Sequence, residues 1–166
     1  MTTQAVAAAG ASARPASGVA GASHDFVTMS IAGQLFGIPV LTVRDVLSTQ
    51  RMTRIPLSSA EVAGALNLRG RIVTAIDVRR RLALPPRASD APAMNVVVES
   101  RGELYSLLVD EVGEVLSVPD ALYERNPATL DPRWREVSGG IYTLEGRLLV
   151  VLDVPAVLRL SRATQE

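Results

Sequence analysis

The chain has 166 residues, enough for one domain or for two small ones that share a core. Its 17 basic and 17 acidic residues cancel, so no general field gathers nucleic acid or an anionic membrane surface. It contains no cysteine, which excludes a disulfide framework, a thiol nucleophile and a thiolate metal site.

Residues 1–25 are predicted to form a disordered tail, because the segment is rich in Ala, Gly, Ser and Thr and buries little apolar area. It lacks the basic start and the continuous apolar core of a secretion signal. Residues 161–166 are predicted to form a short C-terminal tail. Apolar runs such as 147–154 are far shorter than the roughly 20 residues that cross a bilayer. We therefore expect a soluble chain with no direct membrane insertion.

From Phe26 onward, short apolar runs alternate with Gly, Pro and Asp at the close spacing of many-stranded β folds. The same pattern occurs twice. Pairs at an offset of 69 run from Gly33/Gly102 and Leu35/Leu104 through Phe36/Tyr105 and Val40/Val109 to Val43/Val112, Asp45/Glu114 and Ser48/Ser117. Pairs at an offset of 76 run from Gly64/Gly140 through Gly70/Gly146 to Asp77/Asp153 and Leu82/Leu158. The second copy is therefore seven residues longer in its middle.

The repeat predicts an all-β fold with short helices, built as two five-stranded β-barrel lobes with a shared core. Lobe one spans about 26–84, a Pro- and Ala-rich linker spans 85–93, and lobe two spans about 94–160. Each lobe is expected to contain a hairpin that turns at Gly70 or at Gly146, where glycine accepts positive φ.

Asp77 and Asp153 could be taken for a catalytic pair of carboxylates. Both stand at the same place in their repeat, however, where an apolar strand meets a short helix. That position favours an N-cap, whose oxygen accepts backbone N–H bonds, and Pro155 in the first turn fits this interpretation.

Other catalytic and metal-binding signals are missing. His24, the only histidine, stands at the edge of the predicted tail, where no scaffold aims it. Neither Ser58-Ser59 nor Ser138 can be joined to a histidine triad, and there is no phosphate-binding glycine loop. We therefore expect no enzymatic activity, no cofactor and no metal.

The basic run Arg79-Arg80-Arg81 could indicate a nucleic-acid contact on a small barrel. Single-strand binders place aromatic faces beside such charges, and none of the six aromatic residues is adjacent to this run. A solvated helix face is the favoured interpretation, and nucleic acid is not expected as a partner.

The two predicted hairpins differ in their polar side chains. The first reads Asn67-Leu68-Arg69-Gly70, whereas the second reads Thr143-Leu144-Glu145-Gly146. Leu68 and Gly70 belong to the shared fold, but Asn67 and Arg69 are free to serve a partner. From position alone, Arg69 fits an exposed turn charge and a binding residue equally well.

Several stretches of the chain closely resemble the CheW family of chemotaxis coupling proteins. They are the run from Val62 through Asn67-Leu68-Arg69-Gly70 to Asp77-Val78-Arg79, then Phe36-Gly37-Ile38 with Val43-Arg44-Asp45-Val46, Thr53-Arg54-Ile55-Pro56, Val109-Asp110-Glu111-Val112, and Leu148 to Val154. In the family's last triplet of the first run, Leu stands where this chain has Val78. The resemblance covers Phe26 to Leu160.

The resemblance implies two SH3-like barrels, no catalysis, and a cytoplasmic adaptor recruited to receptor arrays at the inner face of the membrane. Its implied partners are the cytoplasmic tips of chemoreceptors and the regulatory domain of the histidine kinase CheA. The implied receptor-binding residues are Val43, Asp45, Gly64, Asn67, Arg69 and Gly70, and the implied kinase-binding residue is Met94. Asp45 is one methylene shorter than the Glu usual in the family.

Two alternatives remain open at this point. One is a coupling protein of a chemosensory-like pathway that does not control flagella. The other is a single-stranded nucleic-acid binder built on small barrels.

Overall fold

The computed structural model describes residues 22–88 and 90–160, and strands make up most of that part of the chain. The strands are β1 (Ser23–Ile31), β2 (Gln34–Pro39), β3 (Val43–Leu47), β4 (Val62–Leu68), β5 (Arg71–Asp77), β6 (Met94–Ser100), β7 (Glu103–Val109), β8 (Glu111–Pro119), β9 (Tyr123–Glu124), β10 (Ser138–Leu144) and β11 (Arg147–Leu152). The helices are η2 (Val40–Thr42), α2 (Val78–Arg81), η3 (Asp120–Leu122), α3 (Pro132–Val137) and α4 (Val154–Val157). The predicted all-β fold with short helices is confirmed.

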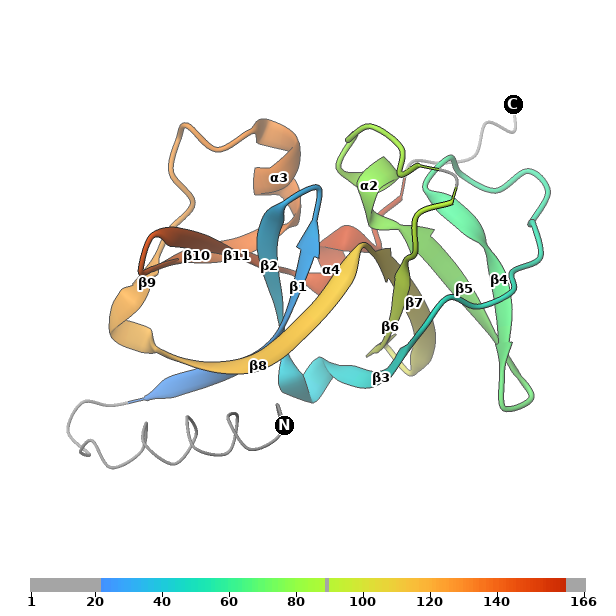
Figure 1. Ribbon diagram of the computed structural model, residues 1–166, viewed down its shortest axis with the longest axis horizontal. Helices are drawn as coiled ribbons and strands as arrows, with labels where there is room; N and C mark the ends of the chain where they lie inside the picture. The colour runs from blue at the N-terminus through green and yellow to red at the C-terminus, as the bar shows by residue number, and fades with distance from the viewer. Residues whose placement is uncertain (1–21, 89, 161–166) are drawn as a thin grey trace.

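The strands form two sheets, which lie on the left and the right of Figure 1. The six-stranded sheet has the order β8-β1-β2-β11-β10-β9, and the five-stranded sheet has the order β3-β6-β7-β5-β4. Strands β8 and β9, at opposite ends of the first sheet, are joined directly through η3, so this sheet closes on itself. In the second sheet the chain after β3 returns to β4, where Thr53 and Ala65 exchange two backbone hydrogen bonds of 2.8 Å. Closure leaves little exposed sheet edge.

The two sheets do not follow the two halves of the chain. Strands β1 and β2 belong to the first half, yet they pair with β8 and β11 of the second. Strands β6 and β7 belong to the second half, yet they pair with β3 and β5 of the first. The predicted lobes 26–84 and 94–160 are therefore repeats in the sequence but not the units in space. Each sheet combines two strands of one repeat with the rest of the other.

The predicted N-terminal tail also extends too far. Strand β1 begins at Ser23, and the N–H of Asp120 donates to the carbonyl of Ala22 at 3.0 Å. Residues 23–25 therefore belong to the sheet, because they complete the pairing with β8. Residues 1–21 and 161–166, the rest of the two predicted tails, lie outside the described residues.

The repeated residues occupy equivalent structural positions in the two halves. The Asp77 side chain accepts a hydrogen bond from the N–H of Arg79 and caps α2. Asp153 caps α4 in the same way through the N–H of Ala156. Gly70 and Gly146 lie in the hairpin turns, with φ of 86° and 69°. The capping interpretation of the two aspartates and the two glycine turns are confirmed.

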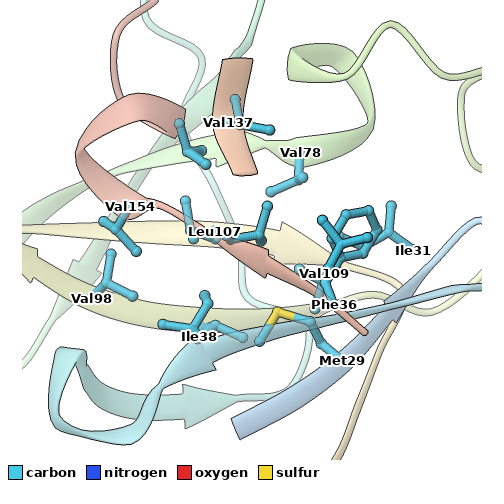
Figure 2. Packing of buried hydrophobic residues seen from close by; sticks show 14 of the residues in the cluster. Met29, Ile31, Phe36, Ile38, Val78, Val98, Leu107, Val109, Val137 and Val154 are labelled. Carbon is cyan, nitrogen blue, oxygen red and sulfur yellow. The ribbon is translucent and has the colours of Figure 1, made fainter. Parts of the chain in front are cut away.

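The largest core cluster contains residues from both sheets. Figure 2 shows Met29, Phe36 and Ile38 of the six-stranded sheet packed with Val98 and Leu107 of the five-stranded sheet. All five side chains are at most 1% exposed. Because this cluster joins the two sheets, we expect them to fold and unfold together.

A charged cluster, which the sequence did not predict, closes the junction at the linker. The Asp110 carboxylate accepts hydrogen bonds from Arg79 at 2.7 and 3.0 Å, from Arg87 at 2.9 Å, and from the N–H of Ala32 at 2.8 Å. Burial alone would raise the pKa of Asp110, but these donors lower it to about 2. The hydrogen bonds to Asp110 raise the pKa of Arg79 in turn.

The basic run of α2 is therefore mostly not a solvated face. The side chains of Arg79 and Arg81 are 16% and 12% exposed, and only Arg80 is half exposed. Arg81 donates to the last carbonyls of α4, those of Ala156 and Val157, at 3.0 Å each. The solvated-face interpretation is wrong for Arg79 and Arg81, because they bind partners that are distant in the sequence.

Candidate protein-binding site

The turn between β4 and β5 presents the polar residues that distinguish the first hairpin. Arg69 and Gly70 both have positive φ, 51° and 86°, as a tight hairpin turn requires. Asn67 closes the turn, because its side-chain oxygen accepts the N–H of Gly70 at 2.9 Å. This hydrogen bond fixes the Asn67 oxygen and leaves its NH2 group and the Arg69 guanidinium to face a partner.

Gly64 has a structural reason to be glycine. It lies at a β-bulge in β4 with φ of 153°, and a Cβ there would stand 2.7 Å from the carbonyl oxygen of Thr53. Its counterpart Gly140, with φ of 131°, lies at the bulge of β10, and a Cβ there would clash with the ring of Tyr123. Since both halves need glycine here, Gly64 shapes the hairpin that carries Arg69.

Asp45 and Arg69 come together across the surface of the five-stranded sheet. A bulge between Val43 and Asp45 interrupts the pairing of β3 with β6. The Asp45 Oδ2 atom lies 3.1 Å from Arg69 Nη2, and its Oδ1 accepts the N–H of Val46 at 2.9 Å. Arg69 is 76% exposed and Asp45 26% exposed, so the pair contributes little to stability. Its main effect is to hold the guanidinium in place before a partner arrives.

Val43 and Met94 are half-buried, whereas Asn67, Arg69 and Gly70 are exposed. Val43 pairs with Val98 and lies half-buried against the core. Met94 lies at the opposite end of β6, where it pairs with Val109, and it is also half-buried. The structure thus brings Asp45, Asn67, Arg69 and Gly70 to one surface, with Val43 and Gly64 on the strands that lead to it. Met94 is separate from this group.

The segments that carry these residues also expose apolar side chains that the sequence did not predict, among them Leu41, Val46 and Ile72. Leu41 in η2 is 85% exposed, and Ile72 at the start of β5 is 72% exposed. Arg44 links η2 to the neighbouring strand, because it donates to the carbonyl of Leu41 at 3.4 Å and to Glu99 at 2.8 Å. The repeat could have indicated that Leu41 is unusual, because its counterpart at an offset of 69 is the charged Asp110. Large apolar side chains that stay exposed to solvent are candidates for contact with another protein.

Features that would indicate other chemistry have structural roles or are missing. His24 Nδ1 lies 2.5 Å from Asp120 Oδ1 and ties the start of β1 to η3. Within residues 22–88 and 90–160, no three His, Cys, Asp or Glu side chains gather as metal ligands would. In the same ranges, no helix is long and apolar enough to cross a membrane.

Comparisons of the sequence with known proteins all indicate the same family, and the comparison of the fold agrees with it. Residues 25–162 match the family model of the CheW-like domain. The chain is 27% identical over 134 residues to a probable chemotaxis protein CheW of Rhizobium etli, covering 81% of this chain and 86% of that protein. It is 28% identical over 132 residues to the chemotaxis protein CheW of Bacillus subtilis, covering 80% and 85%. The fold is similar to the crystal structure of a scaffolding protein, TtCheW, from Thermoanaerobacter tengcongensis, with a TM-score of 0.76, 24% identity, and coverage of 87% of this chain and 99% of that one.

Proposed function

The chain belongs to the CheW-like domain family, a family of chemotaxis scaffold proteins and not of enzymes, and on this premise we propose that it couples chemoreceptors to the histidine kinase CheA. Its place of action is the cytoplasmic face of the membrane, where receptor tips and kinase meet. The residues proposed to bind the receptor are Val43, Asp45, Gly64, Asn67, Arg69 and Gly70. Met94 is proposed to contribute to the kinase contact.

The arrangement of Asp45 and Arg69 carries this proposal. Arg69 is highly exposed, its pair with the partly buried Asp45 gives the fold little stability, and the turn that carries Arg69 is fixed by Asn67 and Gly70. Residues on a loop supported by a rigid hairpin are well placed for recognition. The exposed Leu41 and Ile72 add apolar area that an amphipathic receptor helix would cover.

Coupling requires no bond to be made or broken. A scaffold that holds receptor and kinase together turns a weak bimolecular encounter into an intramolecular one and raises the effective concentration. The ligand state of the receptor then shifts kinase activity through contacts whose energies differ between the two receptor states.

The test is to measure binding of the purified chain to a chemoreceptor signalling fragment and to CheA separately, and then kinase activity in the mixture of all three. We expect binding to each partner alone and a kinase activity that changes with receptor only when the chain is present. Binding to neither partner, with a folded chain, would refute the proposal. Binding to receptors of a pathway that controls surface motility instead of flagella would favour the alternative pathway.

A further inference from the structure

The seven additional residues of the second half lengthen a connection that covers part of the core. We call Trp134 and Glu136 of this connection the plug. They belong to the connection that contains α3, and Trp134 of this helix packs on Phe36 of β2 with ring centroids 5.5 Å apart. Phe36 is completely buried. Glu136, two residues after Trp134, lies 3.8 Å from Arg81 of α2. The plug thus combines an aromatic side chain with a carboxylate that meets an arginine.

The equivalent place in the other half has no aromatic cover within residues 22–88 and 90–160. The repeat offsets relate Phe36 to Tyr105 of β7 and Leu82 to Leu158. Phe36 and Leu82 are 0% and 1% exposed, whereas Tyr105 and Leu158 are only half-buried. The connection between β3 and β4, which corresponds to the one that contains α3, forms no helix in its described residues. Within the described residues, Tyr105 therefore lacks the aromatic cover that Trp134 gives to Phe36.

A hollow of about 550 Å³ opens at this place. Tyr105, Pro155 and Leu158 give it an apolar surface, and Arg101, Glu103 and Arg159 lie on its rim. Its volume falls within the usual range of ligand-binding pockets, about 300–1,000 Å³. Glu103 accepts the hydroxyl of Tyr105 at 2.9 Å, and this hydrogen bond raises the pKa of Tyr105.

The rim carries surplus positive charge. The side chains of Arg101 and Arg159 form no ion pair or hydrogen bond within residues 22–88 and 90–160, and both residues are exposed. Among the described residues that line the hollow, Glu103 supplies the only carboxylate against these two guanidiniums. A ligand with a negative charge is therefore favoured over a neutral or positive one.

We propose that this hollow binds an aromatic side chain of a partner protein, with a carboxylate one or two residues away that meets Arg101 or Arg159. The filled site around Phe36 shows that the fold accepts an indole ring at this position, with Glu136 beside Arg81 as the model of the ion pair. None of the residues assigned to receptor binding lines the hollow. The inference therefore holds or fails independently of the proposed function.

The first experiment uses small probes on the full chain labelled with ¹⁵N. N-acetyl-tryptophan, which carries both ring and carboxylate, is expected to shift the amide signals of residues 100–105 and 158–159, with a Kd on the order of 1 mM. N-acetyl-tryptophanamide, which lacks the charge, should bind about threefold more weakly. N-acetyl-alanine should give no saturable shift. A five-residue peptide with Trp-Ser-Glu at its centre should bind at least as well as the amide, and its Trp-to-Ala analogue should not.

Two variants serve as matched controls. Leu158→Trp fills the hollow with the chain's own indole and should abolish probe binding while the chain stays folded. Trp134→Ala empties the equivalent site beside Phe36 and should add a second set of shifts in β2, which shows that the probe detects sites of this kind. Melting temperature is measured for both, so that loss of folding is recognised.

Four results would overturn the proposal. The first is that no probe gives a saturable shift at residues 100–105, and the second is that N-acetyl-alanine gives shifts equal to those of N-acetyl-tryptophan. The third is that the probe binds at least tenfold more tightly to the chain shortened to residues 1–160. The fourth is that probe binding weakens as the concentration of the chain rises. The third result would assign the hollow to residues 161–166 of the chain itself. The fourth would assign it to a second copy.

Discussion

The two hairpin turns occupy the same position in the two halves, but only the first brings an arginine against an aspartate of a neighbouring strand. Asp45 and Arg69 lie 3.1 Å apart, whereas their counterparts at offsets of 69 and 76 are Glu114 and Glu145, both acidic. The turn glycines and the bulge glycines are common to both halves. What the two turns share is thus explained by folding, and the exposed Arg69, which only the first turn carries, is available for recognition.

The same comparison separates Leu41 from its counterpart Asp110. Asp110 is the centre of a buried charged cluster with Arg79 and Arg87, and its side chain is 19% exposed. Leu41 is 85% exposed and buries almost nothing. One position therefore stabilises the junction between the sheets, while the equivalent one presents apolar surface to solvent.

The largest difference is expected for Asp110→Ala against Leu41→Ala. Asp110→Ala leaves the guanidiniums of Arg79 and Arg87 without their carboxylate at a mostly buried place, so the free energy of unfolding should fall by about 3 kcal/mol. Leu41→Ala should change it by less than about 0.5 kcal/mol. Urea unfolding followed by circular dichroism measures both. Equal losses for the two variants would contradict the assignment of the cluster as a structural element.

Acid unfolding tests the same cluster by protonating the Asp110 carboxylate, which removes its charge and leaves the size of the side chain unchanged. The pKa of Asp110 is lowered to about 2 in the folded chain, below its ordinary value of 3.8. The carboxylate therefore adds stability above about pH 4, and this contribution disappears as the pH falls towards 2. We expect the loss of stability between pH 4 and pH 2 to be smaller in Asp110→Asn than in the parent chain. Parallel curves for the two proteins would show that Asp110 does not contribute in this range.

The sequence predicted the strands, turns and caps because these depend on local patterns. Glycine at positive φ and aspartate before a short helix have local causes, and Gly70, Gly146, Asp77 and Asp153 lie where expected. The exchange of strands between the halves is not local. Strand β2 has the same alternation of apolar residues whether it pairs with a strand of its own half or with β11, so the pattern could not distinguish the two topologies.

The candidate site could be predicted only in part from the sequence. The offset between the copies indicated Arg69 as an unshared turn residue, and the structure places it beside Asp45, 24 residues earlier in the chain. Arg79 was misinterpreted because its partner Asp110 is 31 residues away. No helical period or charge run identifies a partner at that distance.

After Asp110 and Leu41, the next largest difference in stability is expected between the two bulge glycines. In Gly64→Ala the new Cβ meets the backbone carbonyl of Thr53 at 2.7 Å, so the chain around the bridge to β4 must shift. In Gly140→Ala it meets the ring of Tyr123, a side chain that is 45% exposed and can move away. Both variants carry the strain of positive φ, about 1 kcal/mol. We expect Gly64→Ala to lose about 3 kcal/mol and Gly140→Ala about 1.5 kcal/mol in urea unfolding. A larger loss for Gly140→Ala would show that Tyr123 is held more rigidly than its exposure indicates.

Variants of the two turns are expected to differ in their affinity for the receptor and not in their stability. Arg69→Ala should keep the parent melting temperature, because exposed substitutions change stability by less than about 0.5 kcal/mol. Its affinity for a chemoreceptor fragment should fall by about thirtyfold, equivalent to about 2 kcal/mol for an arginine at the centre of an interface. Affinity for CheA should stay within about threefold of the parent. Glu145→Ala, the matched turn residue, should change neither affinity.

These measurements are made on the same purified proteins by calorimetry for stability and by titration for each partner. Unchanged receptor affinity in Arg69→Ala would assign Arg69 to the fold's exposed charges. A parallel loss of stability and of both affinities would make it a structural residue. Either result would remove the central residue of the proposed receptor surface.

The smallest difference is expected between the two helix caps. Asp153 is exposed and accepts one capping hydrogen bond, from the N–H of Ala156 at 3.3 Å, so Asp153→Ala should cost about 1 kcal/mol. Asp77 is 9% exposed, and besides its capping bond it lies within 3.6 and 3.9 Å of Arg80 and Arg87. Asp77→Ala should therefore cost about 2 kcal/mol, since it also removes a charge from two neighbouring guanidiniums. Asn keeps the capping oxygen without the charge, so Asp153→Asn should recover nearly all of the lost stability and Asp77→Asn only about half. Full recovery in Asp77→Asn would show that the cap alone explains this residue, and that the arginines around it add nothing to the difference between the halves.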